Sequence, residues 1–71
     1  MLKRICLMTY HAVNKKPPIM FIQAKLNQNF LYAGMVYSKY GFFTAYRYDT
    51  RSVVDIPLEA SIIPCDVEVS K

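Results

Sequence analysis

The chain of 71 residues lacks most of the features on which a functional assignment usually rests. It has no tryptophan, one histidine, two glycines and two cysteines. A zinc site needs several Cys or His ligands at short spacing, and the lone His11 has no such companions. Gly34 and Gly41 do not form the glycine-rich loop that binds a phosphate. The sequence therefore predicts no metal, no cofactor and no nucleotide site.

Residues for acid–base or nucleophilic catalysis are also missing in any recognisable arrangement. Cys6 and His11 are five positions apart on the first expected strand. Their side chains would therefore point to opposite faces of that strand. The five acidic residues do not have a spacing that supports a general acid–base pair. We therefore expect that the protein is not an enzyme.

Acidic residues are absent from the first 48 positions, which carry seven lysines and arginines. The rest of the chain has five acidic residues and two basic ones, so the formal charges of +7 and −3 sum to +4. This asymmetry indicates an anionic partner, either a nucleic acid or an acidic patch on a protein. A fold that brings the acidic last strand beside the basic strands would also balance the charge.

Long apolar runs are absent too, and no stretch approaches the ~18 residues of a membrane-spanning helix. Lys3-Arg4 and the apolar residues after it resemble a secretion signal only in part. The polar residues at 9–11 interrupt the run, and no small-residue cleavage site follows. We expect a cytoplasmic protein without membrane association, in which Cys6 and Cys65 are reduced, mostly buried thiols.

The aromatic residues are concentrated in positions 30–49, which hold five of the six tyrosines and three of the four phenylalanines. Val, Tyr, Phe and Thr favour a pleated, partly buried sheet. Gly41 can adopt the positive φ that tight hairpin turns need. We therefore predict two long strands joined by a two-residue loop, either Tyr40-Gly41 or Lys39-Tyr40.

Either loop would pair odd positions of the first strand with even positions of the second, so both predict the same two faces. One predicted face carries Leu31, Ala33, Met35, Tyr37, Phe42, Thr44, Tyr46 and Tyr48. The other carries Phe30, Tyr32, Gly34, Val36, Phe43, Ala45 and Arg47, with Phe43 buried and Arg47 at the rim. Neither face is polar, so the sheet is covered on both sides, closed into a barrel, or left with an exposed aromatic surface.

The remaining segments predict short strands at 2–13, 52–56 and 62–69. Residues 19–26 fit a strand or a helix begun at Pro18, and their composition favours the strand. In the last strand the inward set is predicted to be Ile63, Cys65, Val67 and Val69. The outward set is predicted to be Ile62, Pro64, Asp66 and Glu68, and Pro64 there marks an edge strand.

These elements predict a single all-β domain over residues 1–71 with at most one short helix. The expected architecture is a small antiparallel sheet of about five or six strands, rolled into a partly open barrel. Its size and turn spacing are similar to those of SH3-type and OB-type barrels. The similarity concerns shape alone, because no motif of either family is present.

Binding is the function that this composition favours. The first hypothesis is a small inhibitor or adaptor that docks on a larger protein with an acidic or apolar patch. The bias toward Lys, Asn, Ile, Phe, Tyr and Met is typical of an AT-rich genome such as a bacteriophage's, which would make a host protein the partner. The second hypothesis is a nucleic-acid module with tyrosine stacking and phosphate contacts from Lys and Arg. The third hypothesis is self-association, because so small a chain buries only part of its apolar surface.

The predicted partner-binding residues are the aromatic and basic side chains of the hairpin and of the loop before it. They are Lys15, Lys16, Tyr37, Lys39, Tyr40, Tyr46, Arg47 and Tyr48. Within this set, Tyr37, Tyr46 and Tyr48 are predicted to form one exposed platform. A buried hydroxyl without a partner is costly, so three tyrosines on one face favour a surface position.

Overall fold

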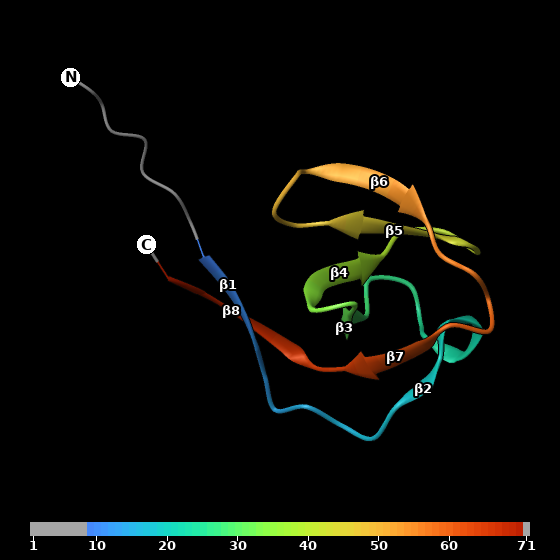
Figure 1. Cartoon of the computed structure of the whole chain (residues 1–71), viewed down its shortest axis with the longest axis horizontal. Helices are drawn as coiled ribbons and strands as arrows, with labels where there is room; N and C mark the ends of the chain where they lie inside the picture. Colours follow the sequence, from blue (N-terminus) through green and yellow to red (C-terminus); the bar gives the residue numbers. More distant parts are fainter. Residues whose placement is uncertain (1–8, 71) are drawn as a thin grey trace.

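A computed structural model describes residues 9–70 and shows a chain of short β-strands (Figure 1). A single 3₁₀ turn, η1, interrupts them. The elements are β1 (Thr9–Val13), β2 (Ile19–Met20), η1 (Phe21–Gln23), β3 (Asn29–Tyr32), β4 (Met35–Lys39), β5 (Thr44–Arg47), β6 (Ser52–Asp55), β7 (Ser61–Pro64) and β8 (Asp66–Ser70). Every strand pair is antiparallel. The predicted all-β class, with at most one short helix, is therefore confirmed.

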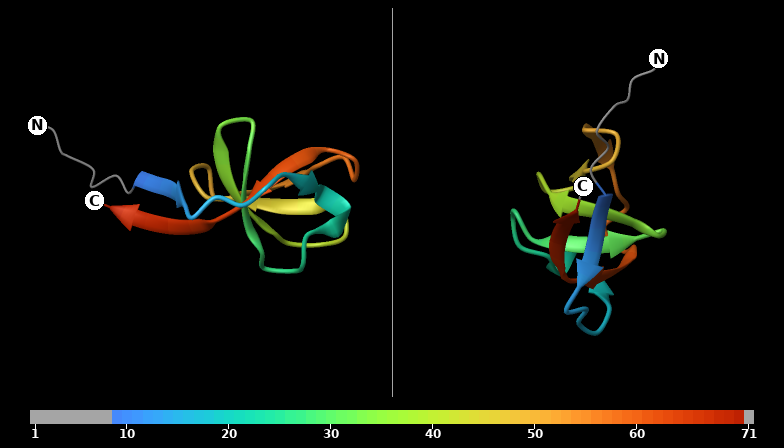
Figure 2. Two further views of the ribbon diagram at one scale, coloured as in Figure 1. Left: turned by 90° about the horizontal axis from the view of Figure 1, so that it is seen from below. Right: turned by 90° about the vertical axis from the view of Figure 1, so that its left-hand side faces the viewer.

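The strands form a six-stranded sheet in the order β2-β7-β3-β4-β5-β6 and a two-stranded ribbon of β1 and β8. Only Cys65 separates β7 from β8, so the ribbon continues from the larger sheet and projects away from it (Figure 2). The molecule is elongated, with extents of 45 × 24 × 18 Å. In the described part of the chain, the end strands β2 and β6 do not pair with each other. Closure into a barrel is therefore not confirmed.

The segment predicted as one strand up to Tyr40 is in fact the hairpin of β3 and β4. Its turn is Ala33-Gly34, with φ values of 53° and 78°. Positive φ at both central residues is the geometry of a type I′ turn, which matches the twist of the flanking strands. The prediction of one long strand was wrong because the turn-forming glycine is Gly34, whose place between apolar residues concealed it.

Two substitutions in this turn should change stability in opposite directions. Gly34→Ala should destabilise the fold by about 1 kcal/mol, because a side chain at positive φ is strained. Crowding adds nothing, since a Cβ at Gly34 meets no atom within 4 Å. Ala33→Asn should stabilise by about 0.5–1 kcal/mol, because Asn tolerates this conformation better than Ala. Urea denaturation of the two variants and the wild type measures both shifts, and equal midpoints would contradict this turn geometry.

The loop between β4 and β5 is longer than predicted. Lys39 pairs with Ala45, which leaves five residues between them. Odd positions therefore pair with odd positions, as Tyr37 does with Arg47. The two predicted faces are wrong for this reason: Tyr37 and Tyr46 lie on opposite sides of the sheet.

The core lies on the face that carries Tyr37. The ring of the fully buried Phe30 stacks on Tyr37 at 5.5 Å and meets the edge of Phe21, also at 5.5 Å. Two irregular segments cover this face, η1 and residues 58–60. They are joined to each other by backbone hydrogen bonds, since Phe21 N–H donates to Ala60 O at 2.9 Å and Ile22 N–H donates to Leu58 O at 3.0 Å. The other buried members of the core are Ala24, Ala45, Ile56 and Ile62.

The predicted strand at 52–56 is confirmed as β6, whereas two other segments differ from prediction. Residues 19–26 contain the two-residue β2 followed by η1, so neither a full strand nor a regular helix forms. The predicted edge strand at 62–69 is split at Cys65, and its first half, β7, lies inside the sheet. Ile62 and Pro64 are buried there instead of facing outward. Of the predicted first strand, only β1 falls within the described residues.

The position of Pro64 explains how an interior strand tolerates a proline. Pro64 ends β7, so its missing N–H interrupts no central part of the ladder. Its carbonyl still accepts the N–H of Lys16 at 2.8 Å, and the next residue, Cys65, donates to Asn29 O at 3.1 Å. The strand is therefore held on both sides while it passes from β7 into β8.

Candidate functional site

Five large apolar side chains are exposed in η1 and the two loops near it. The ribbon of η1 lies at the end of the sheet away from the β1–β8 ribbon (Figure 2). We call this group the aromatic end. Its members and their exposed fractions are Ile22 (44%), Leu26 (64%), Tyr40 (65%), Phe42 (64%) and Phe43 (53%). Exposed apolar side chains that occur together typically mark an interaction site. Phe43 was predicted to be buried, and that prediction is wrong.

Backbone hydrogen bonds hold the two loops of the aromatic end side by side. Asn27 N–H donates to Lys39 O at 2.8 Å, and Lys39 N–H donates to Gln28 O at 2.9 Å. These bonds continue the β3–β4 ladder by one step and bring the segment that carries Leu26 next to Tyr40. The second loop is in turn joined to the segment after β6, because Ile56 N–H donates to Phe43 O at 2.9 Å.

Gly41 keeps the loop between β4 and β5 tight. The N–H groups of Tyr40 and Gly41 both donate to Thr44 O, at 3.0 and 3.1 Å. A Cβ on Gly41 would lie 2.5 Å from Thr44 Oγ1, so a larger residue here would force the Thr44 side chain to move. Phe42 and Phe43 are the residues left at the tip, and both face the solvent.

Lys39 is buried, so its predicted contact with a partner is wrong. Its register places it on the core face, where only 5% of the residue is exposed. The ammonium donates to Phe21 O at 3.1 Å and to Ala24 O at 3.0 Å, and it lies 4.6 Å from the centre of the Phe21 ring. Lys39 therefore fixes η1 and the loop after it against the end of β4, which makes it a scaffold of the aromatic end.

The predicted platform of three tyrosines does not exist, because Tyr37 is buried in the core. Tyr46 and Tyr48 are half-buried, with their rings 5.7 Å apart. The Tyr48 ring also lies 5.1 Å from that of Tyr10 in β1, and its hydroxyl donates to Asn29 Oδ1 at 2.7 Å. Burial raises the pKa of Tyr48 above its usual value. The contact between Tyr48 and Tyr10 attaches β1 to the sheet. A partner-binding role for Tyr46 and Tyr48 stays a prediction.

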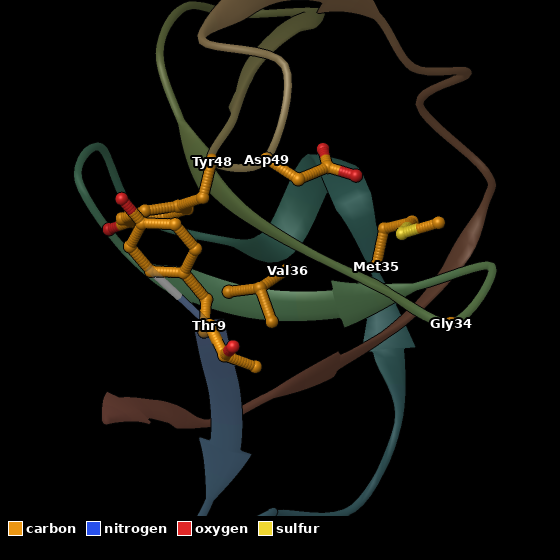
Figure 3. A pocket seen from close by; sticks show the side chains of 7 residues that line it. Thr9, Gly34, Met35, Val36, Tyr48 and Asp49 are labelled. Atoms are coloured by element: carbon orange, nitrogen blue, oxygen red, sulfur yellow. The ribbon is translucent and has the colours of Figure 1, made fainter. Parts of the chain in front are cut away.

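A cavity of about 320 Å³ opens beside Tyr48 (Figure 3). Tyr48 and Met35 flank Val36, and Asp49 lies at the margin. Arg47 forms an ion pair with Asp49, which lowers the pKa of that carboxyl. The predicted binding residue Arg47 is thus already engaged with an anion of its own chain. A volume of this size is at the lower limit for small-molecule sites, and its lining is mainly apolar.

The other predicted binding and thiol residues lie elsewhere. Lys15 and Lys16 are exposed in the loop before β2, so they remain available for a partner. Cys65 is buried, and its burial raises the pKa of the thiol. Cys6 lies outside the described residues, so reduction of the pair stays a prediction.

The part of the chain that the structure describes contains neither a cluster of metal ligands nor a membrane-spanning helix. Among residues 9–70, no three His, Cys, Asp or Glu side chains come together in a way that would hold a metal ion. In the same range, no helix is long and apolar enough to cross a membrane.

The chain matches no protein-family model, and no curated protein or solved structure is detectably similar to it. The candidate site therefore rests on its own geometry. The sequence identified Tyr40 and placed Phe42 on the same predicted face as the tyrosine platform, but it missed Ile22, Leu26 and Phe43 as members of the exposed group. The one available signal was the adjacent pair Phe42-Phe43 next to a glycine, since a loop around Gly41 releases both rings from the sheet.

Proposed function

We propose that this chain is a small non-enzymatic binding protein, an inhibitor or adaptor, that docks on a larger protein through its aromatic end. The exposure of Phe42 and Phe43 at the tip of a tightly held loop carries this proposal. Burying a Phe side chain in a partner contributes about 1.5–3 kcal/mol. The loop is already ordered by the chain's own hydrogen bonds, so little additional conformational entropy is lost on binding.

The surroundings of the aromatic end indicate the chemistry of the partner. Exposed charges of both signs adjoin it, with Lys25 before Leu26 and Asp55 across from Thr44. An apolar centre with a polar rim is the usual anatomy of a protein interface. We therefore propose an apolar recess on the partner protein rather than a strongly acidic surface.

Nucleic-acid binding has less support from the geometry. Of the predicted stacking and phosphate-binding residues, Tyr37 and Lys39 are buried and Arg47 is paired with Asp49. The exposed Lys15 and Lys16 lie in the loop before β2, whereas Tyr40 lies in the loop after β4. A continuous basic track beside an aromatic platform, which single-strand binding uses, is not formed by these residues.

The double substitution Phe42→Ser, Phe43→Ser should abolish partner binding and leave the fold intact. Both side chains are more than half exposed, so their loss should change stability by less than about 1 kcal/mol. The wild type and the variant would be immobilised and exposed to a cell lysate. Any protein retained only by the wild type would be purified, and its affinity for the wild type and for the variant would be measured by calorimetry. We expect at least a hundredfold weaker binding by the variant, on the order of 3 kcal/mol.

Val69→Ser is the matched control, because Val69 is also exposed (48%) but lies in the β1–β8 ribbon. It should bind as the wild type does. Equal binding by the aromatic-end variant would refute the proposal. Salt-sensitive binding to a single-stranded oligonucleotide, with no protein partner, would favour the nucleic-acid hypothesis instead.

A further inference from the structure

The outer edge of β6 is an unpaired strand edge in the described part of the chain. β6 is the last strand of the six-stranded sheet and pairs only with β5. Its sequence, SVVD, contains neither a proline nor a lysine, which are the residues that usually protect an edge. The opposite edge strand, β2, has only two residues and follows Pro17-Pro18. The two edges of the sheet therefore differ in how well they resist pairing with another chain.

The pairing of β6 with β5 shows which backbone groups point outward. Ile56 N–H donates to Phe43 O, and this pair continues the register in which Val54 lies opposite Ala45. Hydrogen-bonded pairs alternate along an antiparallel ladder, so Val54 faces β5 with its N–H and C=O. The N–H and C=O groups of Val53 and Asp55 consequently point away from the sheet.

We propose that this edge pairs with the same edge of a second copy of the chain, antiparallel and about a two-fold axis through Val53. The Val53 N–H of each copy then donates to the Val53 carbonyl of the other, which uses the outward groups identified above. The same register brings Arg51, which lies in the turn just before β6, beside Asp55 of the other copy. Cross-strand pairs of opposite charge stabilise a sheet. The two six-stranded sheets become one continuous sheet, and the interaction is isologous.

Charge selects this register over its neighbours. Shifting the pairing by two residues in either direction separates Arg51 from Asp55, and larger shifts bring Asp55 opposite Asp55 or Arg51 opposite Arg51. Both side chains are exposed, and neither has a salt-bridge partner among the described residues. Pro57 is the next outward position and has no N–H, so it ends the pairing.

The side chains at the centre of the contact are apolar. Val53 is 48% exposed and lies across from Tyr46 on the same face of the sheet. Pairing places Val53 against its counterpart and partly covers both tyrosine rings. The edge is short, so the expected dimer is weak and depends on protein concentration.

Sedimentation equilibrium of the full chain at low ionic strength tests the proposal. The wild type should show a monomer–dimer equilibrium. Arg51→Asp and Asp55→Arg each turn two attractions into two repulsions, so each should raise the dimer Kd at least about tenfold. Both positions are exposed, and Asp tolerates the φ of 55° at residue 51. Circular dichroism of each variant confirms that it is folded.

Mixing the two variants provides the decisive measurement. In the mixed dimer, Asp at position 51 of one chain faces Arg at position 55 of the other, and the second contact joins Asp55 to Arg51. The mixture should therefore associate at least as tightly as the wild type, although each variant alone does not. The double variant Arg51→Asp, Asp55→Arg should also regain dimerisation.

The substitution Phe42→Ser is the control for self-association through the aromatic end, and it should leave the dimer Kd unchanged. A wild type that stays monomeric at millimolar concentration would overturn the proposal. A dimer that is insensitive to the single charge reversals, or is not restored on mixing them, would overturn it as well. The proposal does not depend on the aromatic end, because Arg51, Val53 and Asp55 are not among the five members of that group.

Discussion

Phe30→Ala should strongly destabilise the fold. Phe30 is fully buried, with its ring between those of Tyr37 and Phe21. Truncation of such a side chain leaves a cavity and costs about 3–5 kcal/mol. A chain of this length has a total stability on the order of 4–10 kcal/mol, so much of the margin is lost. Urea denaturation followed by tyrosine fluorescence measures the shift of the midpoint.

The matched control is Phe42→Ala, which makes the same chemical change at a residue that is 64% exposed. It should change the free energy of unfolding by less than about 1 kcal/mol. The comparison separates burial from residue type, since both positions lie in the aromatic-rich part of the sequence. Similar midpoints for the two variants would contradict the assignment of the core face.

Lys39→Met should destabilise the protein by about 2–3 kcal/mol, although it replaces a buried cation with an apolar side chain of similar length. The substitution removes the donor to Ala24 O, which leaves a buried carbonyl without a partner. Phe21 O loses the same donor but still accepts the N–H of Ala24. The interaction of the ammonium with the Phe21 ring is lost as well. Chemical denaturation of the variant measures the sum of these effects.

Lys25→Met is the control, because Lys25 is exposed and adjoins the same loop. It should change stability by no more than about 0.5 kcal/mol. If Lys39→Met equals or exceeds the wild type in stability, the cost of burying the ammonium outweighs its hydrogen bonds. That result would show that Lys39 does not stabilise the aromatic end.

The misplaced tyrosines of the candidate site have one physical origin, the length of the loop between β4 and β5. A two-residue loop at Gly41 predicts Tyr37, Tyr46 and Tyr48 on one face, whereas the five residues between the paired Lys39 and Ala45 bury Tyr37. A change of register by one residue moves every side chain of a strand to the other face. Both faces of this hairpin are apolar, so the pattern of residues could not correct the register.

The amino-acid sequence by itself determined the class of the fold. Frequent β-branched and aromatic residues, with turn residues at short intervals, specify short antiparallel strands, because these preferences act locally. The tertiary structure alone decided which aromatics are core and which are exposed. It buried Tyr37 and Lys39, exposed Phe42 and Phe43, and left one edge of β6 unpaired among residues 9–70. These outcomes depend on which strands meet and in which register, and such non-local pairings leave no periodic signal in a chain that is apolar on both faces.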